Sequence, residues 1–200
     1  GKPAPTSLLV AVPALLAAAG RAALAWQTYD QERVDVIVRA AAAAAAHAAR
    51  DLALEAVSET GRGVVEDKEA KNLFAATTVA QDLLAQRTVG VVGHDEGLGL
   101  THIAEPVGTV VALTPVTNPT STTVFKSLLC LKTRNPVVFA FHPSAQRCSS
   151  RAARIVRDAA LAAGAPSGCI QWVGDPDMAT TRELLSSPDT SMVLATGGNA

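Results

Sequence analysis

The second half of the chain alternates short apolar runs with longer amphipathic stretches. Four short runs have the character of strands, and they cover residues 107–114, 137–141, 169–173 and 192–195. The first is β-branched and apolar, as buried strands are. Apolar residues recur at helical spacing in the segments between them, residues 119–132, 144–163 and 178–186. This alternation predicts an α/β fold with a doubly wound, mostly parallel sheet.

The first 87 residues show helical periodicity instead. A first helix is expected to begin at Pro13. Its buried side is expected to carry Leu15, Leu16 and Leu24. The sequence Thr28-Tyr29-Asp30-Gln31 has the form of a capping box and opens a second helix, which continues through an alanine-rich stretch to Val57. A third helix is predicted over residues 66–87. Its expected inward side chains are Leu73, Phe74, Val79, Leu83 and Leu84.

Two short strands, residues 88–93 and 101–104, flank the polar turn His94-Asp95-Glu96-Gly97. This turn could hold a metal ion in principle, but adjacent residues converge poorly on one ion. A solvated turn is the better interpretation, and no metal site is predicted. The chain is therefore expected to comprise a mostly helical region, residues 1–87, and an α/β region, residues 88–200.

Composition narrows the function classes. Of the 200 residues, 48% are hydrophobic and 18% are charged, which suits a globular domain with its own core. A formal net charge of −1 leaves no basic face for phosphates, so no nucleic-acid partner is expected. No segment reaches the roughly 18 uninterrupted apolar residues that cross a membrane. Residues 8–19 faintly resemble a signal peptide, but Pro13 interrupts the run and favours a first helix.

The chain has three cysteines, Cys130, Cys148 and Cys169, without paired spacing. This usage indicates a reducing compartment, the cytoplasm, with a buried thiol as the expected role of each.

Candidate chemistry gathers where the strand at 107–114 ends. Pro115 stops that strand, and Asn118-Pro119 has the form of a helix start, with Asn as the cap and Pro in the first turn. A strand that feeds a helix N-terminus presents free N–H groups at the carboxyl edge of the sheet, where α/β folds bind nucleotides and other anions. Asn118 is either a donor to a developing oxyanion there or only a helix cap. Gly197-Gly198 closes the last strand in a similar way. The pattern contains no Gly-x-Gly-x-x-Gly fingerprint, so spacing alone leaves the ligand open.

Several blocks in this order resemble the aldehyde dehydrogenase superfamily, and in particular its CoA-acylating branch. The core block is Leu113-Thr114-Pro115-Val116-Thr117-Asn118-Pro119, and it is followed by Lys126-Ser127-Leu128 and Leu131-Lys132-Thr133-Arg134-Asn135. Similar blocks occur at residues 63–68, 103–108, 163–166 and 194–198, so the resemblance covers nearly all of the chain from Val12. The chain resembles the aldehyde dehydrogenase part of bifunctional aldehyde-alcohol dehydrogenases. This resemblance implies a helical N-terminal region followed by a Rossmann-like sheet.

The resemblance implies a nicotinamide cofactor, NAD, and assigns its contacts. These are Leu113, Thr114, Pro115, Val116, Thr117, Asn118, His142, Pro143, Gly197 and Gly198. Ala140 departs from the family pattern, because acylating relatives carry Ser and hydrolytic relatives Lys near this point to bond the ribose. A methyl group makes no such bond, which leaves the choice between NAD and NADP open. Asn118 is shifted by one position relative to the corresponding Asn of hydrolytic relatives.

The reaction that the resemblance implies is attack of a cysteine thiolate on an aldehyde, hydride transfer to NAD, and thioester exchange with coenzyme A. Asn118 would be the oxyanion donor. None of the three cysteines matches the motif of the family's nucleophile, which is expected beyond residue 200 with the rest of the catalytic domain. The resemblance further implies a homo-oligomer whose substrates are a small aldehyde and coenzyme A. No membrane partner is expected.

Two functions of different classes follow. The first is the cofactor-binding part of an acylating aldehyde dehydrogenase. The second is a non-catalytic nucleotide-binding or assembly module that lacks the nucleophile. A third, weaker possibility is an enzyme that uses one of the three cysteines present. If the sheet ended at residues 192–195, its last strand would be an exposed edge.

Overall fold

The computed structural model describes residues 11–197, and Gly198, one of the predicted cofactor contacts, lies outside them. The elements before the sheet are α1 (Val12–Trp26), α2 (Gln31–His47), α3 (Ala49–Thr60), α4 (Val65–Phe74), a π-helical turn (Ala75–Val79), α5 (Ala80–Ala85), β1 (Gly90–Asp95) and β2 (Leu100–Ala104). The remaining elements are β3 (Val110–Leu113), α6 (Pro119–Lys132), β4 (Val137–Ala140), a 3-10 turn (Pro143–Ala145), α7 (Gln146–Ala162), β5 (Ile170–Trp172), α8 (Met178–Ser186) and β6 (Met192–Ala195).

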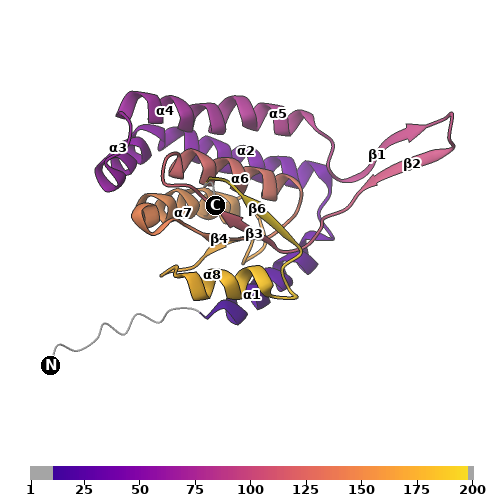
Figure 1. The fold of residues 1–200 in the computed structure, drawn as a ribbon. Helices are drawn as coiled ribbons and strands as arrows, with labels where there is room; N and C mark the ends of the chain where they lie inside the picture. The colour runs from indigo at the N-terminus through magenta and orange to yellow at the C-terminus, as the bar shows by residue number, and fades with distance from the viewer. Residues whose placement is uncertain (1–10, 198–200) are drawn as a thin grey trace.

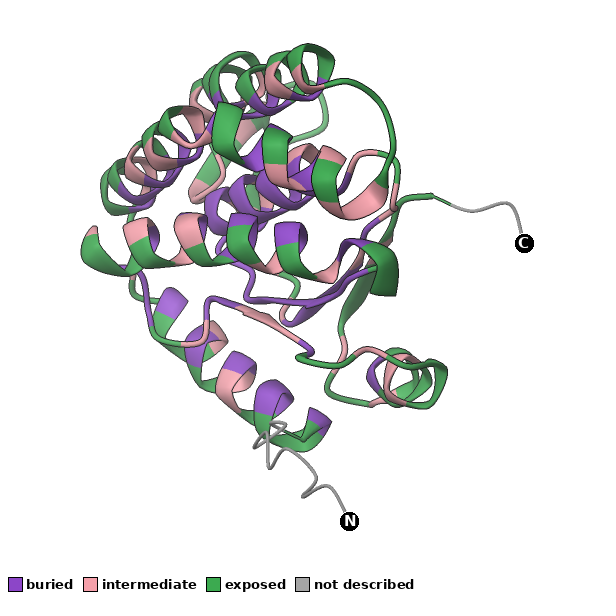
Figure 2. Cartoon of the chain, turned by 90° about the vertical axis from the view of Figure 1, so that its left-hand side faces the viewer, coloured by how far each residue is buried: buried purple, intermediate pink, exposed green. Residues whose placement is uncertain are grey.

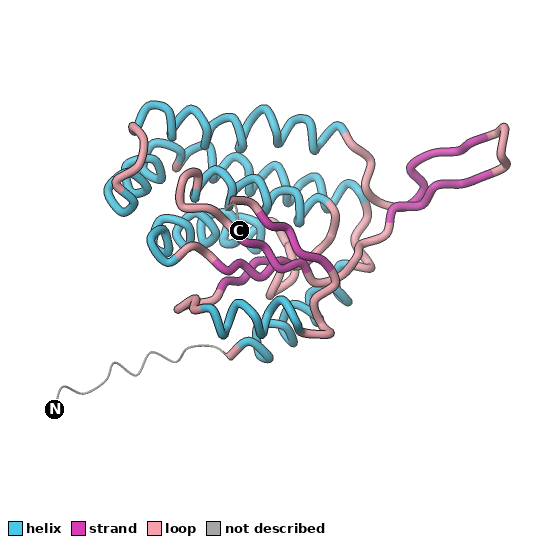
Figure 3. Tube along the Cα trace, viewed as in Figure 1, coloured by secondary structure: helices cyan, strands magenta, loops and turns pink. Residues whose placement is uncertain are grey.

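Within residues 11–197, four parallel strands form the central sheet, in the order β5-β4-β3-β6 (Figures 1 and 3). Alternate residues of β3 point to opposite faces, because side chains alternate along a strand. Val110 and Ala112 belong to a core shared with α2, α6 and α7, whereas Val111 belongs to a second core shared with α1 and α8. Helices therefore cover both faces of the sheet, and the predicted doubly wound α/β fold is confirmed.

The N-terminal helices pack onto the sheet region. Helix α2 lies against α6 and α7, while α3 and α4 contact each other and α6. The buried sides of these helices turn toward the interior in Figure 2. The alanine-rich stretch of α2 supplies Ala41, Ala42 and Ala45 to the core, where small side chains allow close helix packing. None of the helices within residues 11–197 is long and apolar enough to cross a membrane.

The antiparallel strands β1 and β2 form a hairpin that projects from the body of the molecule (Figure 1). Its turn is solvated, as predicted: the amide of Leu98 donates to Asp95, and His94 bonds to Thr101. Residues 11–197 contain no group of three or more His, Cys, Asp or Glu placed to hold a metal ion.

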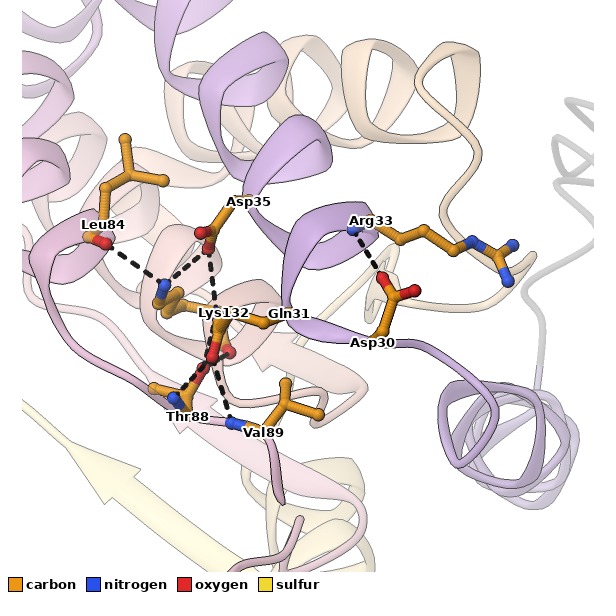
Figure 4. A network of polar contacts seen from close by, with 8 residues as sticks. All are labelled: Asp30, Gln31, Arg33, Asp35, Leu84, Thr88, Val89 and Lys132. Atoms are coloured by element: carbon orange, nitrogen blue, oxygen red, sulfur yellow. Dashed lines mark hydrogen bonds and ion pairs between the residues drawn. The ribbon is translucent and has the colours of Figure 1, made fainter. Parts of the chain in front are cut away.

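A buried polar network ties the base of this hairpin to α2 and α6 (Figure 4). The ammonium of Lys132, at the end of α6, lies 2.5 Å from Asp35 Oδ1, and the Lys132 side chain has no exposed surface. Gln31 Oε1 accepts hydrogen bonds from the backbone amides of Thr88 and Val89, the two residues that lead into β1. Side chains of α2 therefore fix where the hairpin leaves the body.

Several expected inward side chains were wrong, because the face that a helix buries depends on the elements packed against it. Leu24, Leu73 and Phe74, which were expected to face inward, are exposed, at 66%, 38% and 58%. The π-helical turn after Phe74 widens the helix and changes which face is buried.

The second predicted helix is two helices, α2 and α3, which meet at Ala48. Asp30, not Thr28, caps the first of them: its carboxylate accepts from the amide of Arg33, whereas the Thr28 hydroxyl donates to the carbonyl of Ala25.

The strand β6 lies at the edge of the sheet that residues 11–197 form, paired there with β3 alone. Met192 and Val193 are 42% and 43% exposed. The expected exposed edge is therefore present in the described part of the chain.

Candidate functional site

The carboxyl ends of β3 and β6 meet at one edge of the sheet. The amide of Thr196 donates to the carbonyl of Leu113 at 3.2 Å, which joins the two strand ends. Gly197 has φ +101°, and a Cβ on it would lie 2.7 Å from Pro115 Cβ. Only glycine therefore suits this position without a shift of the backbone. The structure therefore brings Gly197 against Pro115, within the predicted segment 113–118.

Two other predicted contacts follow the neighbouring strand β4. His142 and Pro143 are exposed and lie just beyond Ala140, the last residue of β4. His142 Nδ1 accepts a hydrogen bond from the amide of Ser144. Because β4 and β3 are parallel neighbours, these residues belong to the same carboxyl edge. Along that edge, Thr114 is buried and its hydroxyl has no hydrogen-bond partner within the described residues.

Asn118 precedes α6 at the N-cap position, but its side chain makes no capping bond. Its Oδ1 instead accepts a hydrogen bond of 3.1 Å from Lys71 Nζ. The interpretation of this side chain as a helix cap is therefore wrong, although the helix does begin at Pro119 as predicted.

Helix α4 supports the turn before α6 with polar side chains. Lys68 is buried and its ammonium donates to the carbonyl of Thr117 at 2.8 Å. Burial lowers the pKa of Lys68, and the charge of Lys71 lowers it further. Asn72, also buried, donates to the carbonyl of Ala49 and accepts from the hydroxyl of Thr120. Sequence reasoning missed these roles, and the only signal for them was the spacing of polar residues on one helical face.

A second buried lysine lies beneath the strand ends. Lys126 Nζ donates to the carbonyls of Leu113 at 2.7 Å and Leu194 at 2.6 Å, and thus bridges β3 and β6. Burial lowers the pKa of Lys126 to about 8. Sequence reasoning did not identify this role either.

A groove of about 780 Å³ runs between α4 with its π-helical turn and α6. Its lining includes Phe74, Phe125, Lys71, Asn118 and Thr122. The groove is mostly apolar, and Asn118 and Lys71 provide polar atoms from two different elements. This arrangement suits a small, largely apolar molecule with one polar group.

All three cysteines are buried and free. Burial raises the pKa of each thiol to about 12. None of them lines the groove. Because the thiolate is the reactive form, none of these thiols is suited to nucleophilic attack near neutral pH.

The fold defines a class of protein: a doubly wound α/β protein, whose candidate site is at the carboxyl ends of its strands. The chain belongs to the aldehyde dehydrogenase family, whose profile it matches over residues 7–200.

Two relatives show how much of a longer sequence this match covers. Aldehyde-alcohol dehydrogenase 2 of Entamoeba histolytica is 53% identical over 172 residues, which are 86% of this chain and 20% of that protein. The bifunctional aldehyde-alcohol dehydrogenase of Escherichia coli K12 is 46% identical over 173 residues, 86% of this chain and 19% of that protein. The chain therefore spans about a fifth of the length of these relatives.

Solved structures agree with this assignment. The acetylating aldehyde dehydrogenase of Geobacillus thermoglucosidasius has a TM-score of 0.90 and 46% identity, over 92% of this chain and 41% of that one. Among the solved structures at 28% identity are some with bound ligands. Rhodopseudomonas palustris propionaldehyde dehydrogenase, with bound propionyl-CoA, has a TM-score of 0.81 over 94% of this chain and 41% of its own. An engineered glycolyl-CoA reductase with bound NADP+ has a TM-score of 0.80, over 94% of this chain and 42% of its own.

Proposed function

We propose that this chain supplies the cofactor-binding part of a CoA-acylating aldehyde dehydrogenase, which reversibly oxidises a short-chain aldehyde to its acyl-CoA thioester with NAD. The observation that carries the proposal is the meeting of segment 113–118 with Gly197 at one sheet edge, in a chain of the aldehyde dehydrogenase family. The acetylating relative and the structures with bound propionyl-CoA and NADP+ support coenzyme A and a nicotinamide cofactor.

The sheet edge has features that fit a dinucleotide. The absence of a Cβ at Gly197 lets two turns approach closely, the hydroxyl of Thr114 is buried without a partner in the described region, and the N-terminus of α6 points a positive dipole end at the edge. We assign the contacts to Leu113, Thr114, Pro115, Val116, Thr117, Asn118, His142, Pro143, Gly197 and Gly198. When bound, the nicotinamide would supply the hydride acceptor.

The side chain of Asn118 is assigned to the reacting carbonyl. Its Oδ1 is occupied by Lys71, so its Nδ2 is the end that remains to donate a hydrogen bond to the oxygen that becomes an alkoxide. Such donors act on charge that develops in the transition state, and one of them contributes roughly 10²- to 10³-fold to kcat. The groove beside Asn118 is the proposed path for the aldehyde, because Phe74 and Phe125 line it with apolar surface.

The nucleophilic thiol is assigned to sequence outside these 200 residues. Cys130, Cys148 and Cys169 are buried away from the groove with raised pKa values, which leaves none to attack an aldehyde beside Asn118. The division of labour between this region and the rest of the polypeptide is part of the proposal.

The test uses the complete gene product and follows NADH absorbance with acetaldehyde and coenzyme A. We expect CoA-dependent NADH formation, and we expect Asn118→Ala to lower kcat by about 10²-fold. The control is Gln86→Ala, an exposed residue at the end of α5, which should not change kcat. Calorimetric titration with NAD and with NADP compares their dissociation constants and so determines which of the two nucleotides the protein prefers. Binding of either nucleotide without CoA-dependent turnover would refute the dehydrogenase and leave the non-catalytic nucleotide-binding module.

The proposal includes a homo-oligomer in the cytoplasm. The projecting hairpin exposes apolar side chains, Leu98, Leu100 and Ile103, that a second subunit could cover. Free buried thiols are typical of a reducing compartment. Light scattering of the complete protein tests the oligomer, and a monomeric mass at micromolar concentration would refute it.

A further inference from the structure

Two lysines of α4 point at the same turn. Lys68 and Lys71 are three residues apart, so they lie on one helical face. Lys68 is buried and holds the backbone carbonyl of Thr117, while Lys71 is exposed and reaches Asn118 Oδ1 at 3.1 Å. Lys68 holds the backbone of the turn, and Lys71 holds the side chain of Asn118 at its end.

Within residues 11–197, no carboxylate lies within 4.0 Å of the Lys71 ammonium, which leaves Lys71 available for this contact. The ion pairs of the described residues include none with Lys71, whereas its helical neighbour Glu69 pairs with Arg50 at 2.7 Å. Asp67 lines the same groove and also makes no ion pair among those residues. Asn118 Oδ1 is the hydrogen-bond acceptor for Lys71 in the described region.

The chemistry of the two groups determines which way the amide faces. An amide has an oxygen that accepts and a nitrogen that donates, and a flip of about 180° exchanges them. An ammonium has donors only, so it stabilises the orientation with the oxygen toward Lys71 and opposes the flipped one. In this orientation Nδ2 of Asn118 makes no hydrogen bond within the described region, and Asn118 is one of the residues that line the groove.

A positive charge on the oxygen side also strengthens the nitrogen as a donor. Hydrogen bonds with an ionised partner are roughly twice as strong as neutral ones, and linked hydrogen bonds polarise one another. The contact with Lys71 would therefore stabilise the transition state most when Nδ2 faces a developing negative charge.

We propose that Lys71 is a positioning residue, which holds the Asn118 amide with its NH₂ group toward the groove and polarises it as an oxyanion donor. This inference rests on the proposed function, because it explains how Asn118 is set up for the role assigned to it there.

A double-mutant cycle in the complete gene product tests the coupling. Lys71→Met removes the charge and keeps the apolar stem. We expect it to lower kcat for CoA-dependent NADH formation by about tenfold, the effect of losing one charge-assisted hydrogen bond. The KM for NAD should stay within about twofold, because Lys71 is not assigned to the cofactor. Lys71→Arg, which keeps a cationic donor, should recover most of the rate.

The double variant Lys71→Met/Asn118→Ala carries the decisive result. We expect it to be no slower than Asn118→Ala alone, because Lys71 has no role once the amide is gone. Arg62→Met, which removes an exposed charge just before α4, is the matched control and should leave kcat unchanged. The melting temperatures of Lys71→Met and Lys71→Arg should equal that of the wild type, since Lys71 is exposed.

Each contrary result points to a different error. Multiplicative losses in the double variant, or a full rate in Lys71→Met, would overturn the positioning role while leaving Asn118 as the donor. A full rate in Asn118→Ala would overturn the oxyanion assignment of the proposed function and the inference with it.

Discussion

Replacement of Asp35 by Asn tests the buried network that joins α2, α6 and the base of the hairpin. Lys132 Nζ lies 2.5 Å from Asp35 Oδ1, and the side-chain exposures are 0% for Lys132 and 16% for Asp35. Gln31 Nε2 donates to the same oxygen at 2.9 Å. Asn keeps an acceptor and almost the same shape, so the change removes mainly the negative charge (Figure 4).

The loss in the free energy of unfolding comes from Lys132, which stays buried in Asp35→Asn without a carboxylate partner. A buried ion pair that loses one partner leaves an uncompensated charge, which costs roughly 3–5 kcal/mol. Asp35 is partly exposed, so water can replace some of its interaction, and we expect about 3 kcal/mol. For a chain of this size, 1 kcal/mol corresponds to roughly 2–4 °C, so the melting temperature should fall by about 6–12 °C.

Urea unfolding followed by circular dichroism measures the free energy of unfolding. Glu69→Gln is the matched control, because the Arg50–Glu69 pair has a similar distance, 2.7 Å, but exposures of 60% and 27%. Exposed pairs contribute about 1 kcal/mol at most. The double variant Asp35→Leu/Lys132→Met should recover much of the loss, since it leaves no buried charge. If Asp35→Asn costs no more than Glu69→Gln, the reasoning about the buried ammonium is wrong.

Three further predictions concern the site and its surroundings. Gly197→Ala should raise the Kd for NAD about tenfold or more, because the new Cβ would lie 2.7 Å from Pro115 Cβ on a backbone with φ +101°. Gly20→Ala is the control in the same calorimetric titration, because no atom lies within 4 Å of its new Cβ. Equal effects of the two changes would refute the steric argument. Burial lowers the pKa of Lys126 to about 8, below the value of about 10.4 in the unfolded chain, so the unfolded state binds more protons between these values. The contribution of Lys126 to the free energy of unfolding should therefore rise from pH 8 to pH 10 by up to about 3 kcal/mol, measured as wild type minus Lys126→Met, and a flat or falling difference would contradict it. The three buried thiols, with pKa values of about 12, should react with a disulfide reagent at pH 8 only after unfolding, and mass spectrometry showing rapid labelling of any of them in the native protein would refute their burial.

The strongest local signals in the sequence determined the elements they mark. Asn118-Pro119 marks the start of α6, and paired valines mark β3 and β4, because the preferences for helix starts and strands act over a few neighbouring residues. The order of several family blocks likewise indicated the aldehyde dehydrogenase family without reference to contacts. The alternation of strands and helices was enough for the doubly wound sheet.

Only the tertiary structure decided which partner each polar side chain has. Lys71 meets Asn118 across 47 positions, Lys126 meets Leu194 across 68, and Lys132 meets Asp35 across 97. It also decided that Phe74 faces a groove and that Leu24 faces solvent, because a π-helical turn and the packing of neighbouring helices set the buried face. Periodicity records that a side chain is apolar or charged, whereas its partner depends on how distant elements pack, and that information lies in the assembled fold.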